Sequence, residues 1–460
     1  MMDKLISYSP TNGKKVGETI VSTQKDVEKA VSKAKTAFQL WKNITFSERT
    51  AYAKELVKLL KTKKEEIAKL TTFEMGKPIQ EARDDITYEL DFINWYASNI
   101  EEILREKVVH VDENAVYKTI YEPYGVCASI APWNFPITMA STGIVAQVLA
   151  GNTVVFKPSE HSTLSQKMFV DLFNQAGLPD GVLQCVMGDS SVGKKLIDSD
   201  IDLVWFTGST AVGQEIYKKC ADKLIRCLLE LGGSSPGIVL ADCDFEKTMD
   251  AIYFGRFFNN GQVCTAVKRL FVEKPIFEKA VKWLVEKVKT VKVGDPTGEV
   301  DFGPLVSQKQ LDTLISQVED ARNKGANIIV GGDKPNGKDY EKGNYYLPTV
   351  VTGVTKDMRI YKEEVFGPVL PVMSFSSEKE VVELANDTPY GLSAEIYTGD
   401  NKKARRVADK IEAGGISINM NIAFLPQCPI GGYKKSGIGR EYGEEGIKEL
   451  AQLKYISVAK

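Results

Sequence analysis

The pattern of apolar and polar positions predicts helices in the first hundred residues. From Thr23 onward, apolar residues recur at helical spacing in TQKDVEKAVSKAKTAFQLWKN, and Ser22 or Thr23 is suited to cap this helix. A second amphipathic run covers 47–69, and a third covers 78–104 after the break at Gly76. The start of the chain is therefore expected to be mainly helical.

Residues 107–123 show instead the alternation and the β-branched, aromatic composition of strands. KVVHV and VYKTIYEP flank the polar stretch DENA, which predicts a β-hairpin. A hairpin between helices needs another element to pack against or pair with its strands. We expect either a second subunit or the strand-like run LKYISVA near the C-terminus to supply it.

Strands and helices alternate most clearly in residues 151–240. The runs TVVFKP, VLQCVMG and DLVWFTGS are predicted strands, each followed by a helix-forming segment, with RCLLELGG and SPGIVL after them. This alternation predicts right-handed crossovers and a parallel, doubly wound sheet, which binds ligands at the carboxyl ends of its strands. A second α/β set is predicted from about 244 to 435.

Composition narrows the classes of function. Of the 460 residues, 43% are hydrophobic and 26% are charged, with a net charge of −2, which is typical of a soluble globular protein and not of one that binds nucleic acid or a membrane. The N-terminus lacks a secretory apolar segment, and no apolar run is long enough to cross a bilayer. Seven scattered cysteines without a CxxC pair indicate reduced thiols in a cytoplasmic protein. Because His110 and His161 are the only histidines, no metal site is expected.

Three residues are candidates for catalysis. Cys264 follows the flexible turn NNG, and a thiolate is a strong nucleophile, although a buried structural cysteine would give the same pattern. Glu230 lies among leucines before two glycines, where burial would raise its pKa toward that of a general base; an ordinary exposed glutamate is the alternative. Asn134, between Trp133 and Phe135, carries a neutral amide that suits an oxyanion donor or, alternatively, an Asx-turn.

Two segments are candidates for holding a nucleotide. GSTAVG (208–213) follows a predicted strand and opens a helix, the context in which a helix N-terminus binds phosphate. In FKPSEHST, Lys157 suits a ribose or a phosphate and Glu160 suits a ribose 2′-hydroxyl, although a solvated pair of loop residues is the simpler interpretation.

Seven segments, in this order, resemble the aldehyde dehydrogenase superfamily over essentially the whole chain: APWNFP, GNTVVFKPSE, FTGSTAVG, LELGGSSP, FNNGQVC, EEVFGP and GGYKKSGIGRE. The resemblance implies an α/β fold of the aldehyde dehydrogenase type. Its parts are a Rossmann-like cofactor domain (1–104 and 124–232), an α/β catalytic domain (233–435) and a small β oligomerisation element (105–123 and 436–460). It also implies a homodimer or homotetramer that acts on a small-molecule aldehyde.

By the same resemblance, Cys264 is the nucleophile, Glu230 is the general base, and Asn134 forms the oxyanion hole with the backbone N–H of Cys264. The resemblance places these residues at the site of NAD or NADP: Trp133, Lys157, Ser159, Glu160, Gly208, Ser209, Gly213, Glu364 and Phe366. Family members that pass the acyl group to coenzyme A generally lack the glutamate. Its presence favours a free acid product over an acyl-transferring or thioesterase-like reaction.

The choice of cofactor depends on two of these residues. Glu160 would repel a 2′-phosphate, so NAD is the expected preference. Lys157 and a rotated Glu160 side chain would still admit NADP.

The substrate is less closely defined. Within the superfamily the chain is most similar to short prokaryotic succinate-semialdehyde dehydrogenases, which predicts succinate semialdehyde. Thr142 and Phe258 stand where many members that bind a carboxylate carry arginine, so another cation is needed; Arg256 is a candidate, with a structural ion pair as the alternative. Phe135 and Phe258 favour a partly apolar tunnel, which keeps lactaldehyde and other small aliphatic or aromatic aldehydes open.

Overall fold

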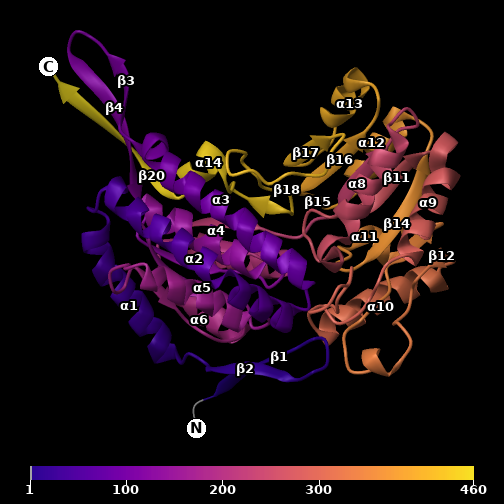
Figure 1. Ribbon diagram of the computed structural model, residues 1–460. Coiled ribbons are helices and arrows are strands. Elements are labelled where there is room, and N and C mark those ends of the chain that lie inside the picture. The colour runs from indigo at the N-terminus through magenta and orange to yellow at the C-terminus, as the bar shows by residue number, and fades with distance from the viewer. Residues whose placement is uncertain (1–2) are drawn as a thin grey trace.

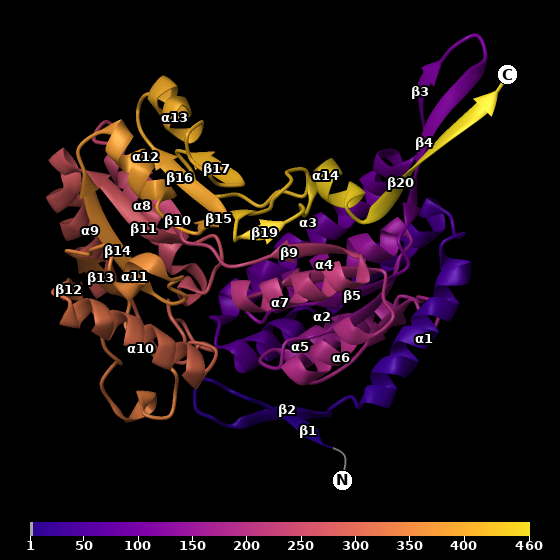
Figure 2. The same cartoon turned by 180° about the vertical axis from the view of Figure 1, so that it is seen from behind.

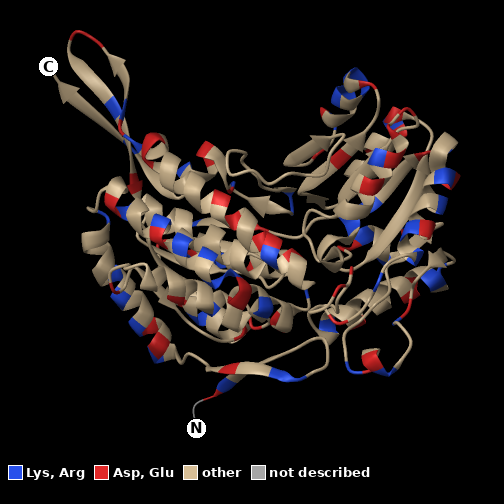
Figure 3. Cartoon of the chain, viewed as in Figure 1, with Lys and Arg blue, Asp and Glu red and all other residues tan. Residues whose placement is uncertain are grey.

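The computed structural model describes residues 3–460 and contains two large α/β units, with a narrow three-stranded sheet projecting from the first of them (Figure 1). Figure 2 shows the same arrangement from behind. Basic and acidic residues are interspersed over both units (Figure 3). Within the described residues, no helix is both long and apolar enough to cross a membrane.

The first unit is built on six strands: β5 (Val126–Ile130), β6 (Thr153–Lys157), β7 (Leu183–Cys185), β8 (Leu203–Thr207), β9 (Arg226–Glu230) and β19 (Gly437–Ile438). Their spatial order is β19-β9-β8-β5-β6-β7. β5 to β9 run parallel to their neighbours, and β19 is antiparallel to β9. The predicted parallel, doubly wound sheet is confirmed.

Helices cover both faces of this sheet because alternate side chains of each strand point to opposite faces. Leu203 and Trp205 of β8 pack in one apolar cluster, and Val204 and Phe206 pack in the other. One face is covered by α2 (Phe46–Met75), α3 (Ile79–Leu104), α4 (Pro136–Ala150) and α5 (Thr163–Gln175), and the other by α1 (Gln24–Trp41), α6 (Ser190–Asp198) and α7 (Thr210–Lys223).

The N-terminal segment contains one element that the sequence analysis did not predict. Helices α1, α2 and α3 confirm the three expected helices, and Thr23 caps α1 by accepting a hydrogen bond from the Asp26 N–H. Before them, β1 (Lys4–Tyr8) and β2 (Lys15–Ile20) form an antiparallel hairpin. These strands are short and largely solvent-accessible, so they lack the regular apolar alternation that identifies a half-buried strand.

The second unit is built on seven strands: β10 (Ser235–Val239), β11 (Val267–Glu273), β12 (Asn327–Val330), β13 (Thr349–Thr352), β14 (Val369–Phe375), β16 (Ser393–Tyr397) and β17 (Gly415–Ile418). Their order is β12-β13-β14-β11-β10-β16-β17, parallel except for β12 against β13. The helices of this unit are α8 (Phe245–Phe257), α9 (Phe277–Lys289), α10 (Gln308–Asn323), α11 (Arg359–Lys362), α12 (Glu378–Asn386) and α13 (Asn401–Ala408). The run SPGIVL, grouped above with the first sheet, belongs here as β10, because the chain crosses between the sheets at 231–234.

The predicted hairpin is confirmed as β3 (Lys107–Val111) and β4 (Ala115–Pro123). The C-terminal strand β20 (Ala451–Ala459) pairs antiparallel with β4 over its full length and supplies the predicted cover. The residues that precede β20 in the expected oligomerisation element, 436–450, are not part of this three-stranded sheet. Within them, β19 pairs with β9, and α14 (Gly443–Lys448) packs against α3. The expected segment 436–460 therefore includes residues that belong to the first unit.

Candidate active site

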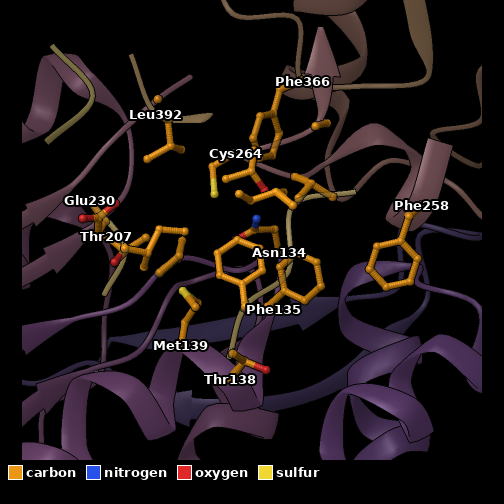
Figure 4. Close-up of a pocket in the computed structure, with 18 of the residues that line it drawn as sticks. Asn134, Phe135, Thr138, Met139, Thr207, Glu230, Phe258, Cys264, Phe366 and Leu392 are labelled. Carbon is orange, nitrogen blue, oxygen red and sulfur yellow. The ribbon is translucent and has the colours of Figure 1, made fainter. Parts of the chain in front are cut away.

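A cavity of about 720 Å³ lies where the two units meet. Residues at or just beyond the carboxyl ends of β5, β8 and β9 line it, which is where parallel sheets bind ligands. Cys264, Glu230 and Asn134 come from three distant parts of the sequence and all line this cavity (Figure 4). The fold thus brings the three candidate catalytic side chains to one place.

A turn in a rarely populated backbone conformation places Cys264 at the cavity. Asn259, Asn260 and Gly261 have φ angles of 51°, 56° and 69°, so three successive residues adopt the left-handed region that asparagine and glycine tolerate best. The Asn259 side-chain amide donates to the backbone carbonyl of Asn134 at 2.9 Å. This bond ties the turn before the thiol to the segment that carries the second candidate residue.

Burial dominates the electrostatics of the Cys264 thiol and raises its pKa to about 12. The charges of Glu364 and Glu230 raise this pKa further, whereas the ammonium of Lys268 lowers it. The thiol is therefore neutral at rest, and any local change that favours its ionisation raises its reactivity.

Asn134 lies between β5 and α4 and lines the cavity. Its Nδ2 donates to the backbone carbonyl of Gln262 at 3.0 Å, which fixes the orientation of the amide. An amide carries two N–H groups, so this bond leaves a second donor. In Figure 4 the Asn134 nitrogen lies on the side of the cavity that faces Cys264, the position that an oxyanion donor needs.

Glu230 is the last residue of β9, and its Oε1 has no hydrogen-bond partner among residues 3–460. Burial raises the pKa of Glu230 well above its ordinary value, the nearby carboxyl of Glu441 adds to this effect, and Arg440 opposes it. Such a group suits a general base because it has unfilled lone pairs and a high proton affinity. Burial also raises the pKa of Glu441, to about 8.

Glu441 lines the same cavity but was not among the predicted residues. It lies just before α14, in a segment brought to Glu230 by the pairing of β19 with β9. This pairing joins residues more than two hundred positions apart, so no local signal marked it.

The residues after β8 fit the phosphates of a dinucleotide. Ser209 caps α7, its side chain accepting from the Val212 N–H at 3.5 Å, and Gly208 precedes it. Both residues line the cavity, together with Thr207, whose Oγ1 has no partner among the described residues. A helix N-terminus beside a free hydroxyl offers the donors that a pyrophosphate accepts.

A carboxylate and two aromatic rings form the wall next to the nucleophile. Glu364 Oε1 accepts from the backbone N–H of Gly233 and from Lys268 Nζ, each at 3.0 Å. Phe366 meets Trp133 edge to face, with ring centroids 5.5 Å apart. This wall fits a ribose and a flat ring. Lys268 was not predicted, although its position four residues after the cysteine was visible in the sequence.

The other candidate cofactor residues lie outside the cavity lining. Lys157 ends β6 and is buried, with its Nζ 3.5 Å from Glu160 Oε2, and burial lowers its pKa. Ser159 is buried beside this pair. Gly213 packs against Leu231, where a Cβ would overlap the leucine side chain. Lys157, Ser159 and Glu160 stand at or just beyond the end of β6, the strand next to β5, where the far half of a dinucleotide would extend.

Aromatic rings line the opposite end of the cavity. The ring centroids of Phe135 and Phe258 are 6.0 Å apart, and Phe254 stacks on Phe258 at 5.1 Å. Lys77, which pairs with Asp85, places its Nζ 3.8 Å from the Phe135 ring centroid. Further aromatic side chains in the lining are Tyr88, Phe92, Phe424 and Tyr442.

Acidic side chains are a feature of the cavity lining. Six carboxyl groups line it: Asp84, Asp85, Glu230, Glu364, Glu395 and Glu441. No lysine, arginine or histidine of the described chain is part of this lining.

Arg256, the candidate partner for a substrate carboxylate, does not reach the cavity. It is fully buried and donates to the backbone carbonyls of Val365, at 3.2 Å, and Gly367. Arg256 is therefore a structural residue. The alternative considered from the sequence was a structural ion pair, whereas Arg256 donates to backbone carbonyl groups. Thr142 also lies away from this lining, with its hydroxyl 3.2 Å from that of Tyr442.

Comparison with known proteins agrees with this geometry. Residues 2–456 match the aldehyde dehydrogenase family. The chain is 36% identical to the betaine aldehyde dehydrogenase of Bacillus subtilis (strain 168) over 453 residues, which are 97% of this chain and 92% of the relative.

Two solved structures are similar over nearly the full length. The NAD+ complex of an aldehyde dehydrogenase from Bacillus cereus has a TM-score of 0.96 at 36% identity, covering 99% of this chain and 93% of that one. An NADP-dependent enzyme from E. coli has a TM-score of 0.96 at 31% identity, covering 100% and 95%. The chain belongs to the aldehyde dehydrogenase family and is an NAD(P)-dependent aldehyde dehydrogenase.

Proposed function

We propose that this enzyme oxidises an aldehyde to the free acid with Cys264 as nucleophile, Asn134 as oxyanion donor and Glu230 as general base, and that its preferred substrates carry a positive charge. The convergence of the three side chains on one cavity supports the first part. The lining holds acidic and aromatic side chains but no basic side chain of the described residues, which supports the second.

The chain's own groups account for the covalent steps. The Cys264 thiol loses its proton to solvent and the thiolate sulfur forms a bond to the aldehyde carbon, while the Asn134 amide with the Cys264 N–H stabilises the new oxyanion. When bound, the nicotinamide supplies the acceptor for the hydride that leaves this carbon. Glu230 then removes a proton from water, which attacks the Cys264 thioester and releases the acid.

A free acid product is favoured over transfer to another acceptor by the state of Glu230. Its carboxyl is buried, has a raised pKa and keeps one oxygen unpartnered among the described residues. We therefore expect the rate of NADH formation to be the same with and without added coenzyme A. An increase on adding coenzyme A would favour the acyl-transferring alternative.

The side chains that line the cavity indicate the charge of the preferred substrate. Succinate semialdehyde, expected from the sequence, would bring a carboxylate among six carboxyl groups with no cation of the described lining to pair with. An ammonium group would instead meet acidic side chains and aromatic rings of the lining such as Tyr88 and Phe424, and the faces of such rings attract cations. The similarity to a betaine aldehyde dehydrogenase points in the same direction.

A matched pair of substrates tests this choice. Betaine aldehyde and 3,3-dimethylbutanal have nearly the same shape and differ in charge, and succinate semialdehyde supplies the anionic case. We expect kcat/KM to be about 10-fold higher for betaine aldehyde than for the neutral analogue. The preference should weaken as salt is added. The highest kcat/KM for succinate semialdehyde would overturn the proposal.

NAD is the proposed preference over NADP. Glu160 stands with Lys157 at the end of β6, and its carboxylate would repel a 2′-phosphate. The prediction is a higher kcat/KM for NAD; an equal or higher value for NADP would contradict it.

We also propose a homo-oligomer assembled through the sheet of β3, β4 and β20. Val108, Leu453 and Tyr455 are exposed there by 57%, 59% and 60%, and the outer edge of β3 is unpaired within the described chain. Such an edge and such side chains favour association. A monomeric mass in light scattering at micromolar concentration would contradict this. The free cysteines suit a reducing compartment, and we propose a cytoplasmic location.

A further inference from the structure

Lys268 is a buried ammonium that contacts both the nucleophile and the cofactor end of the cavity. It lies on β11 with 0% of its side chain exposed. Its Nζ donates to the backbone carbonyl of Cys264 at 2.5 Å and to Glu364 Oε1 at 3.0 Å. It also lies 5.5 Å from the centroid of the Phe366 ring. The reaction steps derived above make no use of this charge.

A buried lysine is costly unless its charge is matched, and the match at Lys268 is incomplete. Its carboxylate partner, Glu364, also accepts from the Gly233 N–H through the same oxygen. Its other partner is a neutral carbonyl, that of Cys264. The remaining positive field therefore acts on its surroundings, and the thiol four residues earlier is among the groups that feel it.

We propose that Lys268 is a positioning residue that couples cofactor binding at Glu364 to ionisation of the Cys264 thiol. The inference rests on the proposed role of Glu364 in holding the cofactor ribose. Without cofactor, Glu364 offsets the charge of Lys268. Hydroxyl groups that donate to Glu364 would share its negative charge, so the field of Lys268 at the sulfur would increase and the thiolate would be favoured.

The other charged groups around the sulfur do not supply this effect. Glu230 on β9 and Glu364 after α11 both disfavour the thiolate. Arg256 on α8 acts on Lys268 and on Glu364, and its own hydrogen bonds go to backbone carbonyls. Lys268 is the cation that opposes the two carboxylates at the thiol.

The rate of iodoacetamide alkylation at Cys264, followed by peptide mass spectrometry over a range of pH, reads thiol ionisation directly. In the full-length enzyme we expect NAD to move the alkylation profile to lower pH. Lys268→Met should move it to higher pH, slow alkylation roughly 10-fold at a fixed pH below the thiol pKa, and abolish the response to NAD. Lys268→Arg should keep the direction of that response.

Two further variants separate charge from structure. Lys77→Met removes another fully buried lysine, one that pairs with Asp85, and should leave the NAD response at Cys264 intact. Glu364→Gln removes the group that offsets Lys268 and also a negative charge that itself disfavours the thiolate, so it should move the profile of the cofactor-free enzyme to lower pH. The Glu364→Gln measurement can be made even if the Lys268→Met variant does not fold.

The outcomes distinguish the two proposals. A Lys268→Met enzyme that binds NAD, as measured by calorimetry, and keeps the wild-type alkylation profile and NAD response would overturn the role of Lys268. So would a Glu364→Gln profile that moves to higher pH. Loss of steady-state turnover in Glu230→Gln and Cys264→Ala tests the proposed function independently of these profiles.

Discussion

The two ends of the cavity are built in different ways. At the cofactor end, Glu364 is held by Lys268 and by the backbone N–H of Gly233. At the substrate end, the rings of Phe135 and Phe258 face one another across 6.0 Å, and Asp84 at the rim has no ion-pair partner among residues 3–460. Fixed polar contacts suit a ligand of constant shape. Aromatic rings and a single unpaired carboxylate select by charge and bulk, and so tolerate related substrates.

The largest expected effect on kcat/KM is at Cys264, which lies between the two ends of the cavity. Cys264→Ala removes the atom that bonds to the substrate, so we expect kcat/KM to fall by on the order of 10⁴-fold or more. NAD affinity, measured by calorimetry, should change little because the cofactor contacts remain. A variant with more than a tenth of the wild-type rate would refute the assignment of the nucleophile.

The next effect concerns the oxyanion donor. Asn134→Ala should lower kcat by about 100- to 1,000-fold, because a donor used mainly in the transition state is lost. The substrate KM should change much less. A loss confined to KM would instead assign Asn134 to ground-state binding. Asn134→Asp, of the same size but without the amide donors, is the matched control and should be as inactive as the alanine variant.

The cofactor end was the part most accessible from the sequence. Thr207, Gly208 and Ser209 form a strand–turn–helix signal within a few residues, and Glu230 is marked by the leucines before it and the glycines after it. Such local patterns determine backbone geometry directly, so a dinucleotide site at the strand ends could be anticipated.

The substrate end could not be anticipated in the same way. Asp84, Asp85 and Tyr88 lie on α3 and reach the cavity because the amphipathic helix packs against α4. Arg256 was expected to bind a carboxylate, yet its position on α8 turns it toward backbone carbonyls in the interior. Periodicity indicates which face of a helix is buried, but not which neighbour or cavity that face meets.

The pH dependence of kcat tests the role of Glu230 as the general base. The negative charge of Glu441 disfavours ionisation of Glu230 and so raises its pKa. Glu441→Gln should lower that pKa, and the acidic limb of the kcat profile should move to lower pH because the base form then persists there. Glu445→Gln, an exposed neighbour on α14, is the control and should leave the limb in place. An unchanged limb in Glu441→Gln would contradict the coupling.

The smallest expected effect is at the rim of the substrate end. Asp84 is exposed and accepts from the Gln80 side chain at 2.9 Å. Asp84→Asn should lower kcat/KM for betaine aldehyde about 3-fold and leave 3,3-dimethylbutanal unchanged. An equal loss for both substrates would show that Asp84 acts on structure and not on charge.

A rapid-mixing experiment on Glu230→Gln with excess NAD and aldehyde tests directly whether Cys264 carries the acyl group and Glu230 releases it. We expect one burst of NADH, close to one per active site, followed by little turnover, with the acyl group found on the Cys264 peptide by mass spectrometry. Sustained turnover at the wild-type rate without a trapped thioester would contradict it.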